Sequence, residues 1–178
     1  MRYFRRFIWY FATRLLIFVL ALGTMMMAFY LAMNASNIYV ILKDGLAKRA
    51  QTVMMGAPEE DLQDFFTSSC LESDAALKTA RQNASPYQLY YSITGFDHRI
   101  NMQYVWCWPW DVIATATIEE RIPAIDGRLN AAGHEWSNAL SLSTAPPSWT
   151  PGRYRVTLVQ QNGHWKINTL VFMEQLNE

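Results

Sequence analysis

Residue types that bind metals or act as nucleophiles are scarce in this sequence. Its 178 residues include 2 cysteines and 3 histidines, and no Cys-x-x-Cys pair occurs. A structural zinc site draws four such ligands at short spacings, which this chain does not offer. A glycine-rich phosphate loop and a serine-centred elbow, which position a phosphate or a nucleophile, are also missing. We therefore predict no metal ion, no cofactor and no catalytic residue, and enzymatic activity is the less favoured expectation.

A surplus of positive charge is missing too. The chain has 15 basic and 15 acidic residues, a formal net charge of 0. Four of the basic residues precede residue 15, so residues 34–178 hold 11 basic against 15 acidic residues, a net of −4. Such a domain repels a phosphate backbone, which excludes nucleic acid as a partner. Disorder is excluded as well, because 14% aromatic residues supply enough apolar surface for a core.

One segment has no charge at all. Residues 15–33 are nineteen consecutive uncharged residues, most of them apolar. At the helical rise of 1.5 Å per residue they cover roughly 28 Å, the thickness of the hydrocarbon core of a bilayer. Four arginines precede the segment, and no acid occurs before Asp44. The positive-inside rule then predicts a cytoplasmic N-terminus and an extracytoplasmic remainder, in a single-pass protein of the cell membrane.

These observations divide the chain into three parts. Residues 1–14 are the predicted cytoplasmic N-terminus, residues 15–43 a transmembrane helix with a stalk, and residues 44–178 an extracytoplasmic domain. The alternative is a cleaved signal peptide, for which Asn34-Ala35-Ser36 offers a weak site. The apolar run is longer than the roughly 7–15 residues of a signal peptide, which favours the retained anchor.

The spacing of apolar residues in the predicted domain changes from helical to alternating about halfway along. Residues 44–83 show helical spacing, with one helix beginning near Pro58 and a shorter one capped by Ser73-Asp74, and Pro86 is expected to end the helical half. Alternation then predicts strands at residues 87–96, 100–106, 111–122, 153–160 and 165–174.

The connections between these strands are predicted from their composition. Asp97-His98-Arg99 is interpreted as a hairpin turn, and Asn162-Gly163 is a strong signal for another. Residues 123–152 form a long excursion with a short element around residues 136–142, and Glu119, Glu120 and Arg121 are expected to be exposed. Helices followed by antiparallel strands indicate an α+β fold.

The last two predicted strands are similar in sequence pattern to those of a known superfamily. Arg153-Tyr154-Arg155-Val156-Thr157-Leu158-Val159, followed by Gly163-His164-Trp165-Lys166-Ile167, resembles the end of the ketosteroid-isomerase-like, or nuclear-transport-factor-like, superfamily. The resemblance covers about residues 44–178 and implies helices packed on a curved, cone-like antiparallel sheet. Membrane-anchored members of that superfamily include extracytoplasmic scaffold subunits of conjugation and type IV secretion machines, to which this chain is similar in architecture.

Trp106, Trp108 and Trp110 form the most unusual stretch, separated by Cys107 and Pro109. In a strand these three side chains share one face, although Pro109 favours an edge or a bend. Core filling under the sheet is the favoured interpretation. A docking patch, the lip of a pocket and an interface toward the membrane are the alternatives.

Two further groups are candidates for chemistry. Cys70 and Cys107 are able to form one disulfide in an oxidising compartment, or to remain buried thiols, which we favour. Asp97 beside His98 suggests acid–base chemistry, but neighbouring residues in a turn point apart, so a structural role is favoured. Two functions remain open, namely a module that binds another envelope protein or itself, and a small-ligand pocket protein or isomerase- or dehydratase-type enzyme.

Overall fold

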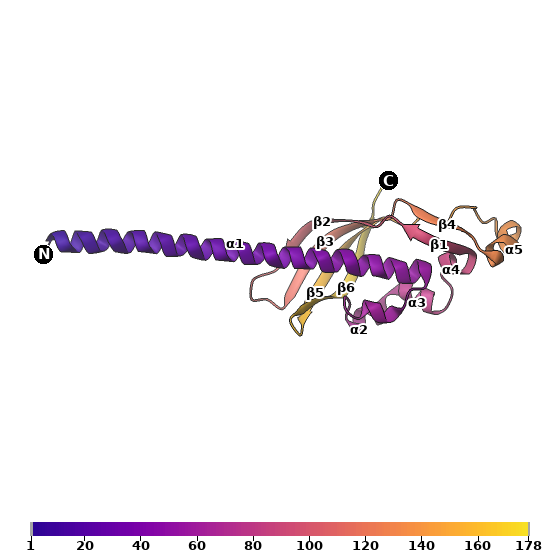
Figure 1. The fold of residues 1–178 in the computed structure, drawn as a ribbon, viewed down its shortest axis with the longest axis horizontal. Helices are drawn as coiled ribbons and strands as arrows, with labels where there is room; N and C mark the ends of the chain where they lie inside the picture. The colour runs from indigo at the N-terminus through magenta and orange to yellow at the C-terminus, as the bar shows by residue number, and fades with distance from the viewer. Residues whose placement is uncertain (1, 178) are drawn as a thin grey trace.

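A computed structural model describes the backbone of residues 2–177 and the side chains of residues 7–177. The chain is a mixed α+β protein with a long, apolar N-terminal helix and antiparallel sheets, which confirms the expected fold class at this level (Figure 1). Residues 15–33 lie in the one described helix that is long and apolar enough to cross a membrane.

That helix, α1 (Arg2–Met55), is continuous and has two different halves. In its first half the described side chains, from residue 7 onward, are almost all exposed, whereas Ile38, Leu42 and Leu46 in the second half are fully buried (Figure 1). Their spacing of four residues puts them on one helix face. Full burial against the domain therefore begins at Ile38, inside the range assigned to the stalk. The helix ends at Gly56, whose φ of +70° suits a helix C-terminus.

The other helices are short. They are η1 (Glu59–Leu62), α2 (Ser68–Ser73), α3 (Ala75–Arg81), α4 (Pro86–Tyr90) and α5 (Ala131–Leu140). Asp74 caps α3 as predicted, accepting hydrogen bonds from two backbone N–H groups. Two expectations are wrong. The helix near Pro58 is a single 3-10 turn, and Pro86 begins a helix instead of ending the helical half, because its fixed φ suits the first helical position.

Six strands make two sheets. The strands are β1 (Tyr91–Phe96), β2 (Arg99–Trp106), β3 (Ile113–Arg121), β4 (Ile125–Leu129), β5 (Gly152–Gln161) and β6 (His164–Gln175). The larger sheet has the order β2-β3-β5-β6, and the smaller one pairs β1 with β4, all antiparallel.

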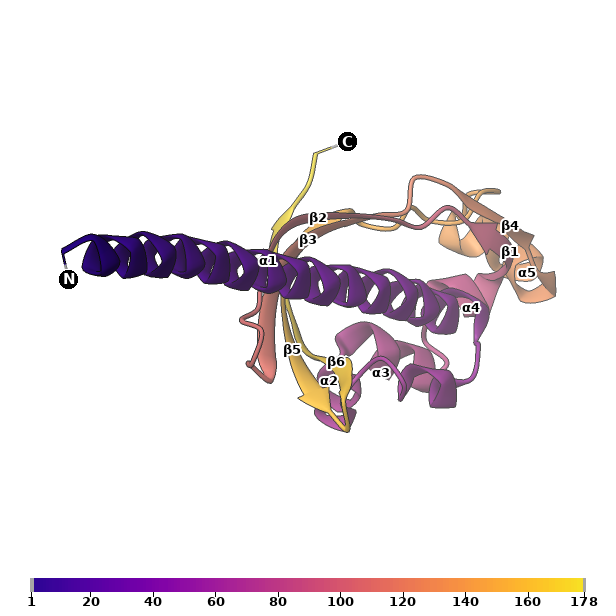
Figure 2. The same cartoon turned by 60° about the vertical axis from the view of Figure 1, so that its left-hand side comes forward.

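The predicted hairpin at Asp97-His98-Arg99 is wrong. β1 pairs with β4 and β2 pairs with β3, so the chain continues through residues 97–98 in one direction. The backbone N–H of Asp97 donates to the carbonyl of Ala124 on the neighbouring segment, which keeps the two segments side by side at this point. β1 and β4 thereby extend the β2–β3 pair toward the end of the molecule farthest from the N-terminus (Figure 2).

The hairpin at Asn162-Gly163 is confirmed. Both residues have positive φ, 52° and 81°, as a two-residue turn between twisted strands requires. The register runs from Gln161 opposite His164 to Gly152 opposite Gln175. This hairpin forms the outer part of the larger sheet.

The core lies between the second half of α1 and one face of the larger sheet. β3 contributes Ala114, Ala116 and Ile118, which are nearly or fully buried and alternate as predicted. A second buried cluster joins α1 to α4 and β1, and Trp149 packs against both clusters. The second half of α1 is therefore an integral core element of the domain.

Candidate functional site

The tryptophan segment, residues 106–112, does not fill the core. Trp106, Trp108 and Trp110 are 53%, 38% and 74% exposed, so the core-filling interpretation is wrong. The three rings contact one another in sequence: Trp106 meets Trp108 edge to face, with centroids 5.4 Å apart, and Trp108 stacks on Trp110, with centroids 5.5 Å apart. The three indoles make one exposed aromatic surface.

The local sequence explains this exposure. Successive side chains along an extended backbone point to opposite faces. The side chain of Cys107 therefore points inward, 7% exposed, and those of its two tryptophan neighbours point outward. β2 ends at Trp106, and beyond Pro109 the backbone N–H of Asp111 donates to the carbonyl of Trp108 to close a turn. The shared face was predictable from the spacing, but which side of the sheet it occupies was not.

Both cysteines are free and buried. Cys70 lies in α2, whereas Cys107 approaches α1, its Sγ lying 4.0 Å from Asn34 Nδ2. Burial raises the pKa of the Cys70 thiol to about 11 and also raises that of Cys107. Both thiols are therefore protonated at neutral pH, and their packing is that of small apolar side chains.

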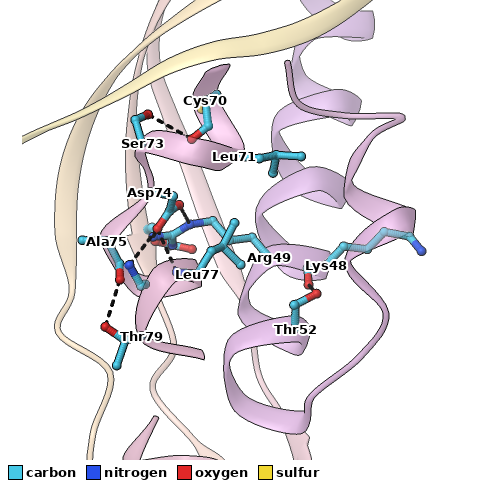
Figure 3. A network of polar contacts seen from close by, with 12 residues as sticks. Lys48, Arg49, Thr52, Cys70, Leu71, Ser73, Asp74, Ala75, Leu77 and Thr79 are labelled. Carbon is cyan, nitrogen blue, oxygen red and sulfur yellow. Dashed lines mark hydrogen bonds and ion pairs between the residues drawn. The ribbon is translucent and has the colours of Figure 1, made fainter. Parts of the chain in front are cut away.

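A buried ion pair joins α1 to α3. Arg49 donates from Nε to Asp74 Oδ2 at 2.5 Å and from Nη2 to Asp74 Oδ1 at 3.1 Å, and both side chains are 8% exposed (Figure 3). The same carboxylate accepts the backbone N–H groups that begin α3. The guanidinium also lies 5.8 Å from the ring centroid of Trp149.

A second buried pair lies on the sheet. His98 Nε2 is 3.1 Å from Glu120 Oε1, with 6% and 0% of the two side chains exposed. Among the described side chains, Arg49 Nη1 and Glu120 Oε2 are buried atoms without a hydrogen-bond partner. The expectation that Glu120 is exposed is wrong, because it continues the buried alternation of Ala116 and Ile118 on β3. His98 thus pairs with Glu120 and not with its neighbour Asp97.

The pKa values of the first pair reflect mutual stabilisation. Burial by itself raises the pKa of Asp74, but the hydrogen bonds and charge of Arg49 outweigh it and hold that pKa below the usual carboxyl value. Burial likewise lowers the pKa of Arg49, and Asp74 more than reverses the effect. Both groups are therefore charged at neutral pH and neutralise each other.

A half-open cleft of about 370 Å³ lies beside this pair. Its lining includes Arg49, Asp74, Cys70 and the contacting rings of Tyr154 and Phe172, whose centroids are 5.5 Å apart. Of its ionisable groups, Arg49 and Asp74 are engaged with each other, and burial raises the pKa of both Cys70 and Tyr154. No described group of three or more His, Cys, Asp or Glu side chains is arranged to hold a metal ion.

The far end of β6 is an exposed sheet edge. β6 is the last strand of the larger sheet, and Val171, Phe172 and Met173 are 55%, 52% and 44% exposed. Only the beginning of its outer edge is covered within residues 2–177, where Phe66 forms a bridge with Ile167. From residue 168 onward, β6 therefore presents a free edge with apolar side chains on both faces.

Comparisons with protein-family models, with curated proteins and with solved structures found no match. The described features that bear on function are two exposed apolar surfaces, the tryptophan segment and the β6 edge, and the long helix that connects the domain to its apolar N-terminal segment.

Proposed function

We propose that this chain is a single-pass membrane protein whose extracytoplasmic domain is a protein-interaction or scaffold module. The observation that carries the proposal is the continuity of α1. One helix contains an apolar segment whose side chains are exposed among the described residues and, further on, the buried residues Ile38, Leu42 and Leu46. An apolar helix of this length with its side chains exposed needs lipid as its surroundings.

Helix continuity matters because it removes any flexible linker. A domain joined to its anchor by disordered chain samples many positions. Here the α-helix is unbroken from the apolar segment into the core, so the domain is held at a fixed height and tilt relative to the anchor. Rigid placement beside a membrane suits a scaffold, whose task is to present a surface in one orientation. The four arginines at the N-terminus favour the cytoplasm for that end.

The β6 edge is the proposed contact for a protein partner, either another envelope protein or a second copy of this chain. A free strand edge offers backbone N–H and C=O groups to an added strand, and exposed side chains beside it provide specificity. Val171, Phe172 and Met173 supply that apolar surface. A kinship with the cone-like scaffold superfamily is part of the proposal, supported by the order of helices, antiparallel strands and closing hairpin.

A photo-crosslinking amino acid placed at Val171 in the full chain tests this contact in the native membrane. We expect a crosslinked adduct from position 171 and none from the exposed position Lys78 on α3, which is the matched control. A Met173→Glu change should abolish the adduct while leaving the melting temperature unchanged, because residue 173 is exposed. An adduct that survives this change, or none at any position of the β6 edge, contradicts the proposal.

A small-ligand pocket protein or isomerase- or dehydratase-type enzyme is the second candidate. The cleft beside Arg49, Asp74 and Tyr154 is the observation in its favour. It ranks below the scaffold because general acid–base chemistry needs a group that is free to exchange a proton. Arg49 and Asp74 hold each other in the charged form.

A further inference from the structure

We propose that the tryptophan segment lies in the headgroup region of the same membrane that α1 crosses. This inference rests on the anchor of the proposed function and adds a second point of attachment. The occupant of the exposed aromatic surface is then lipid, and a protein partner is the alternative that the experiment below distinguishes.

The position of the segment is the first argument. Asn34 is the residue that follows the apolar run 15–33, and its Nδ2 lies 4.0 Å from Sγ of Cys107, within the tryptophan segment. The segment is therefore level with the end of the apolar run. In both ribbon views the loop between β2 and β3 is the part of the domain that reaches furthest toward the N-terminus along α1 (Figures 1 and 2).

The chemistry of the segment is the second argument. Tryptophan is enriched at membrane–water interfaces because its ring is apolar and its N–H is a donor. Beside the three contacting indoles, Val112 and Ile113 are 60% and 55% exposed. Asp111 is the single charged residue between Ile100 and Ile118. With no basic residue there, the contact has no requirement for anionic lipid, so zwitterionic phosphatidylcholine is a sufficient partner.

The two attachments together have a structural consequence. A single helix leaves the tilt of the domain relative to the bilayer open, whereas a second lipid contact beside the helix limits that tilt. The β6 edge is then presented at one height and inclination above the membrane surface.

Bromine-labelled lipid tests the proposal on the full chain. The protein is placed in nanodiscs of phosphatidylcholine with or without bromine in the upper part of the acyl chains, and the bromine-quenched part of the tryptophan emission is measured. The test variant is Trp108→Phe combined with Trp110→Phe. The matched control is Trp136→Phe, since Trp136 is 51% exposed but lies on α5, at the far end of the domain. Trp9→Phe reports separately on insertion of α1.

We expect the quenched emission to fall by about half in the double variant, because it removes two of the four tryptophans placed at the bilayer surface, Trp9, Trp106, Trp108 and Trp110. Trp136→Phe should leave it unchanged. An unchanged value in the double variant, with Trp9→Phe still lowering it, overturns the lipid contact and assigns the segment to a protein partner. An absence of quenching in every variant overturns the anchor itself.

Discussion

Replacing Asp74 with alanine is expected to lower the free energy of unfolding by about 3–5 kcal/mol, because it leaves a buried guanidinium without its partner. Arg49 reaches no other carboxylate by a hydrogen bond among the described residues, and its Nη1 is already unpartnered. The change also removes the cap of α3. Urea unfolding of the full chain in detergent, followed by the fluorescence of the domain, measures the loss.

Glu59→Ala is the matched control. Glu59 also pairs with an arginine, Arg81, but the two side chains are 32% and 38% exposed. A pair so accessible to water contributes about 0–1 kcal/mol. Equal losses for the two variants, or a loss below about 1 kcal/mol for Asp74→Ala, contradict the structural role assigned to the buried pair.

The stabilisation by Asp74 depends on pH in a definite direction. Burial acts to raise the pKa of Asp74, but the lowering by Arg49 is larger than this increase. The folded-state pKa therefore lies below the unfolded-state value. The stabilisation is complete above the unfolded-state pKa, about 4, and is lost as the pH falls through the folded-state pKa. The Asp74→Asn variant lacks this contribution, so the stability difference between it and the wild type should shrink below about pH 4.

Replacing Leu46 with alanine is expected to cost about 2–5 kcal/mol, because Leu46 is fully buried between α1 and the rest of the domain. Val40→Ala in the same helix is the control, since Val40 is 49% exposed and its truncation should change stability by no more than about 0.5 kcal/mol. The same urea titration compares them. Similar values for both would mean that the second half of α1 is not a core element.

Local signals in the sequence predicted several elements well. The turn at Asn162-Gly163 needs two residues with positive φ, and Asn-Gly meets that need without help from the rest of the chain. Asp74 was recognisable as a cap for a similar reason. Pairing between distant strands is not a local property, so the continuation of β1 into β2 was mistaken for a hairpin.

The buried charges were missed although a pattern pointed to them. Arg49 lies three residues after Leu46 on the buried face of α1, and Glu120 lies two residues after Ile118 on the buried face of β3. Charged side chains are usually exposed to solvent, so the sequence favoured the surface for both residues. Their ion-pair partners are brought close only by the arrangement of the elements in space. The tryptophans show the reverse case. Because tryptophan is largely apolar, we predicted that these side chains fill the core. They are exposed instead, in the loop between β2 and β3 that lies beside the end of the apolar run.

Thiol labelling in intact cells tests the membrane topology most directly. Gln175→Cys places a reporter at the exposed end of β6, and Tyr3→Cys places one at the N-terminus, while both natural cysteines are buried. We predict that a membrane-impermeant maleimide labels Gln175→Cys in intact cells and labels Tyr3→Cys only after lysis. Labelling of Tyr3→Cys in intact cells, with Gln175→Cys protected until lysis, would contradict an extracytoplasmic domain.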